Sequence, residues 1–203
     1  MDLADALELL DWKRRVFELY GEIRAAEPAT AWKHWRAVRD DLFRTHPQSP
    51  LLLDARASYP GVPYFPFDAA YRVLAEVEPA PSESTEISSS GHETIAFQRV
   101  GRARFTLLGR EHELELYWLV AYGGGLFVPF RDETSGGETY GGGRYLLDTV
   151  KGADLGEIGG RLVLDFNFAY HPSCSYDPRW VCPLSPPANR LPVAIEAGER
   201  MPG

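Results

Sequence analysis

Residues 94–130, TIAFQRVGRARFTLLGREHELELYWLVAYGGGLFVPF, decide the fold class. Apolar and polar residues alternate along this stretch as they do in half-buried strands. The predicted strands are residues 94–100, 104–108, 114–121 and 126–130. Gly101 and Gly109 stand where tight hairpins need a residue that tolerates a positive φ. Because no stretch of about 10–15 helical residues intervenes, the pattern favours an antiparallel meander over βαβ units.

Strands are also predicted on both sides of this meander. One covers residues 71–77, and two more cover residues 144–148 and 161–168, which brings the total to about seven. Residues 79–93, PAPSESTEISSSGHE, have almost no apolar side chains. We therefore predict a solvated loop between the first strand and the meander.

The N-terminal part of the chain has helical periodicity. Apolar residues recur at helical spacing over residues 3–23, and charged residues cover the remaining faces. A second helix is predicted after Pro28, with Thr30 as its N-cap and with Trp32 and Trp35 on one stripe. We interpret this tryptophan pair as core rather than as an aromatic shelf for a ligand, because such stripes mostly bury apolar area.

These elements predict an α+β fold, with N-terminal helices packed on a mainly antiparallel β-sandwich or partly closed barrel. Its 203 residues are close to the usual size of a single core, so we expect one domain over residues 1–203. Residues 1–46 form the helical part, and residues 59–203 form a β-rich core with an extended C-terminal tail.

The composition narrows the class of partner. Lys plus Arg number 21 against 29 Asp plus Glu, and the net charge of −8 has the wrong sign for a surface that binds nucleic acid. No apolar run approaches the roughly 20 residues that cross a bilayer, and the acidic N-terminus is unlike a signal peptide. We therefore expect a cytoplasmic protein that associates with neither nucleic acid nor membrane. The expected partner is a small molecule, and the sequence predicts no oligomeric state.

A glycine-rich segment is the first candidate for function. Residues 129–148, PFRDETSGGETYGGGRYLLD, include Arg131 and Arg144, which are able to bind a carboxylate or phosphate with two parallel hydrogen bonds each. In the alternative interpretation, the glycines only permit turns with positive φ. The segment lacks the lysine of a P-loop and the strand-to-helix context of a dinucleotide fingerprint, so it predicts no nucleotide motif.

A second candidate segment covers residues 165–184, DFNFAYHPSCSYDPRWVCPL. If a strand continues to residue 168, then Asp165 and Asn167 share one face. Asp165 is then a candidate general base and Asn167 a candidate for orienting a carbonyl group. Solvent exposure or a structural hydrogen bond is the alternative for both.

His171, Cys174 and Cys182 allow three interpretations. They are a possible set of zinc ligands, with a fourth ligand from His92, His112, Glu196 or Glu199, although the spacing is not a recognised zinc signature. His171 is also a possible base that activates one of the thiols as a nucleophile, with Asp165 to orient the imidazole. The third interpretation is that all three residues are structural.

These segments resemble a known family. Residues 129–148 and the stretch LVLDFNFAYHPSCSYDPRWVCPLSPPANRLPVAIEAGER, residues 162–200, resemble the bacterial and archaeal family called domain of unknown function 1684. The resemblance extends to WRAVRDDLFRTHPQSPL, residues 35–51, and YFPFDAAYRV, residues 64–73. It implies no established activity.

The resemblance also selects positions. The residues that match the family pattern are Asp132, Ser135, Gly136, Thr139, Tyr140, 141–143, Arg144, Tyr145, 165–167, Cys174, Cys182, Pro186, Pro187, Asn189 and 197–199. His171 departs from this pattern, because many relatives have asparagine there. A mechanism that needs this histidine is therefore not implied for the family.

The leading functional hypothesis is an enzyme that acts on a small anionic molecule by acid–base chemistry, as a hydrolase or lyase without an identified cofactor. The candidate catalytic residues are Asp132, Tyr140, Asp165 and His171, and the candidate binding residues are Arg131, Arg144, Tyr145, Asn167, Cys174 and Cys182. The alternatives are a non-catalytic module that binds a small ligand or a protein, and a metalloprotein with a His/Cys site. No metal ligand is assigned.

Overall fold

The computed structural model describes residues 2–91, 93–120 and 122–202, and it begins with two helices. Helix α1 (Leu3–Arg24) starts with a capping box between Asp2 and Asp5. Helix α2 (Pro28–Thr45) starts two residues before the predicted N-cap, and Glu27 is its cap. Thr30 instead donates its backbone N–H to the side chain of Glu27. Pro28 fits the first turn, where a backbone N–H has no partner within the helix.

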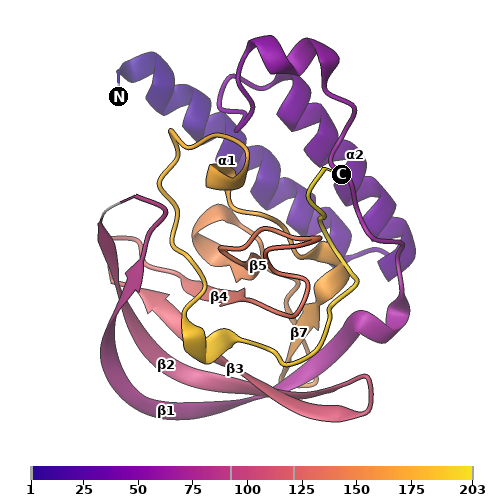
Figure 1. Cartoon of the computed structure of the whole chain (residues 1–203), viewed down its shortest axis with the longest axis vertical. Coiled ribbons are helices and arrows are strands. Elements are labelled where there is room, and N and C mark those ends of the chain that lie inside the picture. The colour runs from indigo at the N-terminus through magenta and orange to yellow at the C-terminus, as the bar shows by residue number, and fades with distance from the viewer. Residues whose placement is uncertain (1, 92, 121, 203) are drawn as a thin grey trace.

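Seven strands form one antiparallel sheet, which confirms the α+β class (Figure 1). The strands are β1 (Arg72–Ser88), β2 (Thr94–Leu107), β3 (Arg110–Leu119), β4 (Leu126–Phe130), β5 (Arg144–Asp148), β6 (Glu157–Ile158) and β7 (Arg161–Asp165). Their order in the sheet is β5-β4-β3-β2-β1-β7-β6, and the sheet is not closed into a barrel. Short 3₁₀ helices are η1 (Asp54–Ser58), η2 (Ala69–Tyr71), η3 (Thr149–Lys151), η4 (Phe166–Phe168), η5 (Ser173–Ser175) and η6 (Pro187–Asn189).

The prediction of a loop at residues 79–93 is wrong over most of its length. β1 continues to Ser88 and pairs with β2 in register from Glu83 opposite Arg99 to Ser88 opposite Thr94. The backbone hydrogen bonds of a hairpin do not require apolar side chains, and Ile87 alone among residues 83–88 is buried. Because the side chains of residues 83–88 are nearly all polar, the sequence pattern did not indicate this part of the strand.

Gly101 does not form the predicted hairpin. It lies inside β2, at a register shift of the ladder with β3, and a Cβ on it would lie 2.8 Å from the carbonyl oxygen of Glu78. The glycine therefore permits a close approach of two backbones. The turn between β2 and β3 is formed by Leu108 and Gly109, with φ of 49° and 76°, as predicted for Gly109. β3 ends at Leu119, and the predicted end at Ala121 lies outside the described residues.

The last predicted strand is also shorter than expected. β7 ends at Asp165, and η4 follows over Phe166–Phe168. The side chain of Asp165 caps this helix by accepting the N–H of Asn167. The prediction that Asp165 and Asn167 alternate on one face of a strand is therefore wrong.

Two apolar clusters hold the layers together. One joins the sheet to the C-terminal segment, residues 183–202, through residues such as Phe130, Phe166 and Ile195. The other joins the helices to the sheet, with the fully buried Trp35 among its members, so the tryptophan stripe is core as expected. In the view of Figure 1 the C-terminal segment runs around β4 and β5 and ends beside α2.

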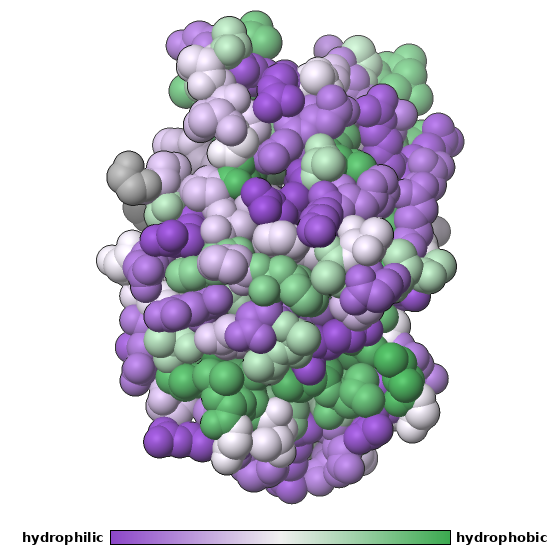
Figure 2. Space-filling view, turned by 90° about the vertical axis from the view of Figure 1, so that its right-hand side faces the viewer, coloured by the Kyte–Doolittle hydropathy of each residue, from purple (hydrophilic) through white to green (hydrophobic). Residues whose placement is uncertain are grey.

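The face in Figure 2 has two zones. Hydrophilic residues dominate its upper part, over the helices, whereas hydrophobic residues form a band across its lower part, over the sheet. None of the described helices combines the length and the apolar character that a bilayer crossing requires.

Candidate functional site

Arg144 and Asp132 lie together, and their hydrogen-bond partners belong to the protein. Both side chains are fully buried, and the Arg144 Nη2 is 3.4 Å from the Asp132 Oδ2. Arg144 also donates to the carbonyl oxygens of Ala197 and Ile195, and Asp132 accepts the backbone N–H of Ile195 at 2.7 Å. This pair therefore fastens the C-terminal segment to the glycine-rich loop.

The glycine-rich loop approaches its own chain closely. Gly143 has φ of 97°, and a Cβ on it would lie 2.6 Å from the carbonyl oxygen of Phe130. Next to this loop, the backbone of Arg131 exchanges hydrogen bonds with Asn189 and Leu191 of the C-terminal segment. At Gly143 and Arg131 the neighbour that the segment approaches is therefore protein backbone.

Asp165 and Asn167 form a second structural pair. Asp165 accepts from the backbone and the side chain of Asn167 and from Arg72, whose Nη1 is 3.1 Å from its Oδ2. Asn167 in turn exchanges two hydrogen bonds with the backbone of Asp68. Burial raises the pKa of Asp165, but its oxygens already accept protein donors. No hydrogen bond among the described residues links this pair to Asp132 or Arg144.

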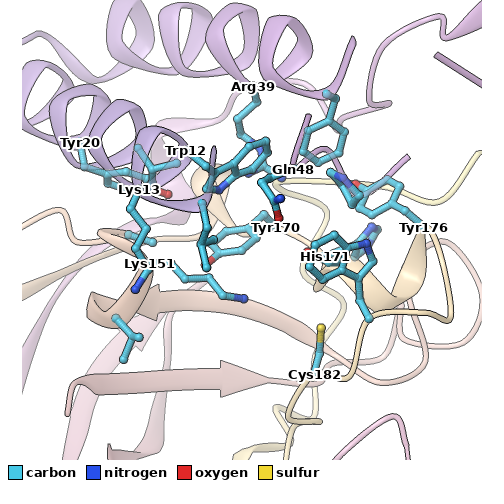
Figure 3. Close-up of a pocket in the computed structure, with 18 of the residues that line it drawn as sticks. Trp12, Lys13, Tyr20, Arg39, Gln48, Lys151, Tyr170, His171, Tyr176 and Cys182 are labelled. Atoms are coloured by element: carbon cyan, nitrogen blue, oxygen red, sulfur yellow. The ribbon is translucent and has the colours of Figure 1, made fainter. Parts of the chain in front are cut away.

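A cavity lies elsewhere, between α1, α2, η3 and the loop after Phe168. It has a volume of about 330 Å³, and six aromatic residues contribute to its walls. We call it the aromatic pocket; the aromatic residues are Trp12, Tyr20, Phe43, Tyr170, Tyr176 and Trp180. Of the candidate site residues, His171 and Cys182 line it. Figure 3 shows Lys13 and Lys151 on one side of this pocket and His171 and Tyr176 on the other.

The cationic residues of the pocket are unusual for this chain. Lys13 and Lys151 are two of only three lysines in a protein of net charge −8. The Lys151 Nζ is 3.9 Å from the Asp148 Oδ2, while Lys13 is half-buried and forms no ion pair with any residue that the structure describes. This side of the pocket therefore carries positive charge that the protein does not fully neutralise.

Glu199 and Arg39 form a buried ion pair at the wall of the pocket. Glu199 is fully buried and accepts from the Arg39 guanidinium, the backbone N–H of His171 and the Tyr176 hydroxyl. Burial lowers the pKa of Arg39, but the Glu199 carboxylate outweighs it and holds that pKa well above its usual value. The guanidinium also lies 4.9 Å from the centroid of the Tyr170 ring. Both charges are therefore satisfied within the protein.

His171 is held as a neutral imidazole. Its Nε2 accepts the backbone N–H of Tyr140 at 3.2 Å, so its proton is on Nδ1, which lies 3.8 Å from the Glu199 Oε2. Burial, followed by the charges of Arg144 and Arg39, lowers the pKa of His171 well below its usual value. The histidine therefore contributes no positive charge to the pocket at neutral pH.

Tyr140 contacts both His171 and Cys174. The Cys174 Sγ is 3.8 Å from the Tyr140 hydroxyl, and Cys174 is half-buried while Cys182 is buried. Tyr145 is buried nearby and donates its hydroxyl to the carbonyl oxygen of Pro183 at 2.6 Å. Both thiols are free.

The zinc interpretation has no ligand set in the described part of the chain. No three His, Cys, Asp or Glu side chains gather there as a metal site requires. His171 faces Tyr140 and Glu199 instead, and His112 lies on β3 against the Phe105 ring. His92, one of the possible fourth ligands, lies outside the described residues.

Sequence reasoning missed Lys13, Arg39 and Lys151 as site residues. They come from α1, α2 and η3, and η3 lies more than one hundred residues after the two helices. The sequence shows only that lysine is scarce, and no pattern in it brings these three residues together before the chain folds.

The fold and this site define an α+β protein with an open antiparallel sheet and a pocket between the helices and the C-terminal half. The chain belongs to the family described as "Protein of unknown function (DUF1684)", whose sequence pattern matches residues 57–200, which confirms the resemblance. The matched range includes His171, Cys174, Cys182 and Glu199 but neither Lys13 nor Arg39.

A solved relative has the same fold. The solution NMR structure of an uncharacterized protein from gene locus rrnAC0354 of Haloarcula marismortui is similar, with a TM-score of 0.61 and 36% sequence identity. The similarity covers 85% of this chain and 94% of that chain. None of the curated proteins matches this chain.

Proposed function

We propose that this protein binds a small molecule with an apolar body and an acidic group, and that the aromatic pocket is the binding site. The observation that carries the proposal is the position of Lys13 and Lys151 on the wall of a pocket whose other walls include six aromatic side chains. The apolar body contacts the rings, and the acidic group lies near the two ammonium groups.

The size of the pocket supports a ligand of this class. Its volume of about 330 Å³ is at the small end of the range for small-molecule sites. Trp180 also lines the pocket, and its indole N–H is buried without a partner in the described residues. A ligand oxygen that reaches this N–H would satisfy it.

Binding has more support than acid–base catalysis. The groups predicted to move a proton, Asp132, Asp165 and His171, all accept hydrogen bonds from the protein, and only His171 lines the pocket. A general base needs a free lone pair within reach of the substrate. Hydrolysis or elimination is therefore the second candidate function, after ligand binding. The two free thiols support a cytoplasmic setting.

The test uses two fluorescent probes of similar shape. 8-Anilinonaphthalene-1-sulfonate is an aromatic anion, and N-phenyl-1-naphthylamine is its uncharged counterpart. We expect the double variant K13A/K151A to bind the anionic probe about tenfold more weakly at low salt, which corresponds to about 1.4 kcal/mol. Binding of the uncharged probe is expected to stay within about twofold, because the aromatic walls are unchanged.

Lys33→Ala is the matched control. Lys33 is the remaining lysine, and it is exposed on α2 away from the pocket lining. If K33A weakens the anionic probe as much as K13A/K151A does, or if K13A/K151A weakens both probes equally, then the lysines do not recognise the anion and the proposal fails.

A further inference from the structure

A second cavity adjoins the aromatic pocket, and the sheet forms most of it. Its volume is about 150 Å³. Its walls include Ile95 and Phe97 of β2, Leu119 of β3 and Phe127 of β4, which are neighbouring strands. We call it the sheet pocket. Ligand binding as proposed above makes no use of it.

The register of the sheet explains why these side chains meet. Phe97 pairs with Leu119 across β2 and β3, and Ile95 lies two residues from Phe97, so its side chain points to the same face. The Phe127 ring is stacked with the Phe97 ring, and their centroids are 5.3 Å apart. Both phenylalanines belong to the apolar cluster that contains Tyr170 of the aromatic pocket. The two pockets therefore lie on the same side of the sheet.

The two pockets meet at η3. Val150 and Lys151 line both of them. Asp148 caps this short helix by accepting the backbone N–H of Lys151 at 3.3 Å. The positive charge of Lys151 therefore lies where the aromatic pocket ends and the sheet pocket begins.

We propose that the ligand of this protein is an acid with two apolar arms, an aromatic arm that occupies the aromatic pocket and a short apolar arm that occupies the sheet pocket. This inference rests on the proposed function and adds the chemical class of the ligand. The acidic group lies between the two arms, because Lys151, one of the two lysines proposed to bind it, lines both pockets.

The size of the sheet pocket limits the second arm. An apolar cavity of about 150 Å³ accommodates a group as large as a benzene ring. The arm therefore has at most about six carbon atoms. Each CH₂ group that leaves water for these walls adds to the affinity, so the length of the arm is a direct measure of whether the pocket is used.

The lining of the sheet pocket also requires an uncharged arm. Apart from Asp148 and Lys151, the residues that line it are apolar. A charged group at the end of the arm would lose its hydration against these walls. If that group were a carboxylate, the negative charge of Asp148 would also repel it. The acidic group of the ligand is therefore at the junction of the pockets and not at the end of the second arm.

The main test is calorimetric titration of the full-length protein with N-acyl-L-phenylalanines, which combine a phenyl ring, a carboxylate and an acyl chain of chosen length. We expect the affinity to rise from the N-acetyl through the N-butanoyl to the N-hexanoyl compound, by about threefold for each added CH₂ group. N-Succinyl-L-phenylalanine has a chain similar in length to the butanoyl chain but ending in a carboxylate. We expect it to bind at least about tenfold more weakly than the butanoyl compound.

A variant with a filled sheet pocket tests where the acyl chain binds. Ile95→Trp places a larger side chain in this pocket, at a strand position where tryptophan is well tolerated. We expect the affinity of I95W to depend on chain length much less than that of the wild type. Ile158→Trp is the matched control, because Ile158 is exposed on β6 and lines neither pocket. It is expected to retain the dependence of the wild type.

Methyl NMR spectra of the wild type locate the chain without any substitution. We expect the N-hexanoyl compound to shift the methyl signals of Ile95 and Leu119 in the sheet pocket. The N-acetyl compound is expected to shift mainly those of Leu9 and Val16 in the aromatic pocket.

Three outcomes would overturn the two-armed ligand. They are equal affinities or no binding for all three acyl compounds in the wild type, the same dependence on chain length in I95W as in I158W, and unshifted methyl signals of Ile95 and Leu119 with the N-hexanoyl compound. In each case the proposed function still stands if K13A/K151A weakens the anionic fluorescent probe alone. If K13A/K151A does not, then the proposed function fails, and the two-armed ligand fails with it.

Discussion

Glu199 connects more of the molecule than any other carboxylate of the site. Its two oxygens accept from Arg39 of α2, from the backbone of His171 and from the Tyr176 hydroxyl. A buried carboxylate is stable only when such donors replace its hydration. The sequence marks this residue only as a possible fourth zinc ligand and as a position that matches the family pattern.

We expect Glu199→Gln to lower the free energy of unfolding by about 3–5 kcal/mol, because the variant leaves the buried Arg39 guanidinium without a counter-charge. Urea denaturation followed by tryptophan fluorescence measures this. Glu196→Gln, three residues earlier at an exposed position, is the control and is expected to change stability by less than about 0.5 kcal/mol. Similar losses in both variants would contradict the role of the ion pair.

Gly143 allows a second test at the scale of a residue. We expect Gly143→Ala to cost at least about 3 kcal/mol, because the new Cβ meets both an unfavourable φ and the carbonyl oxygen of Phe130 at 2.6 Å. Gly136→Ala is the matched control: its φ is 91°, but its Cβ would meet nothing within 4 Å, so only the backbone strain of about 1–2 kcal/mol applies. Equal costs, measured by thermal denaturation, would mean that the close approach is relieved elsewhere.

At the scale of elements, the sequence predicted the bounds of the two most buried strands. Residues 126–130 and 144–148 are strands with the expected bounds, and Gly109 lies in the expected turn. Periodicity failed where tertiary contacts decide the structure. Residues 83–88 pair with β2 although nearly all are polar, and Asp165 ends β7 because its side chain caps η4. Neither interaction leaves an apolar pattern in the sequence.

The polar half of β1 is testable by hydrogen exchange. We expect amide hydrogens in residues 83–88 that bond to β2 to exchange at least about tenfold more slowly than those of the Gly159–Gly160 turn, because ladder hydrogen bonds must open before exchange. Two-dimensional NMR in deuterated buffer measures the rates. Exchange at the rates of an unfolded chain throughout residues 83–88 would support the loop that the sequence predicted.

At the scale of the whole molecule, the C-terminal segment joins the layers. Through Arg144 it holds the glycine-rich loop, and through Glu199 it holds α2. Most polar residues selected from the sequence, among them Asp132 and Asn167, belong to this framework, so a conspicuous motif can reflect assembly of the fold as well as ligand recognition. The pocket could not be predicted in the same way, because its cationic residues come from separate elements and meet only after folding.

This assembly also makes stability depend on pH, through a histidine that stays neutral when folded. In the unfolded chain His171 takes up a proton near pH 6.5, whereas in the folded protein its lowered pKa keeps it neutral. As pH falls from 7 to 5, the unfolded state therefore binds more protons and stability decreases, by at most about 1.4 kcal/mol per pH unit for this group. Asp165 and Asp148 act in the opposite direction, because burial raises their pKa values and the folded state then binds more protons.

His171→Asn separates these contributions. We expect the free energy of unfolding of H171N to fall less steeply between pH 7 and pH 5 than that of the wild type, whatever the stability of the variant at pH 7. Asp165 and Asp148 contribute equally to both proteins, so the difference in slope comes from His171. Urea denaturation at a series of pH values gives the slopes. His34→Asn, at an exposed position on α2, is the control and is expected to retain the wild-type slope. Parallel curves for the wild type and H171N would show that His171 is protonated in the folded protein. Its contact with the Tyr140 backbone would then have to be lost, because an imidazolium nitrogen has no lone pair with which to accept that N–H.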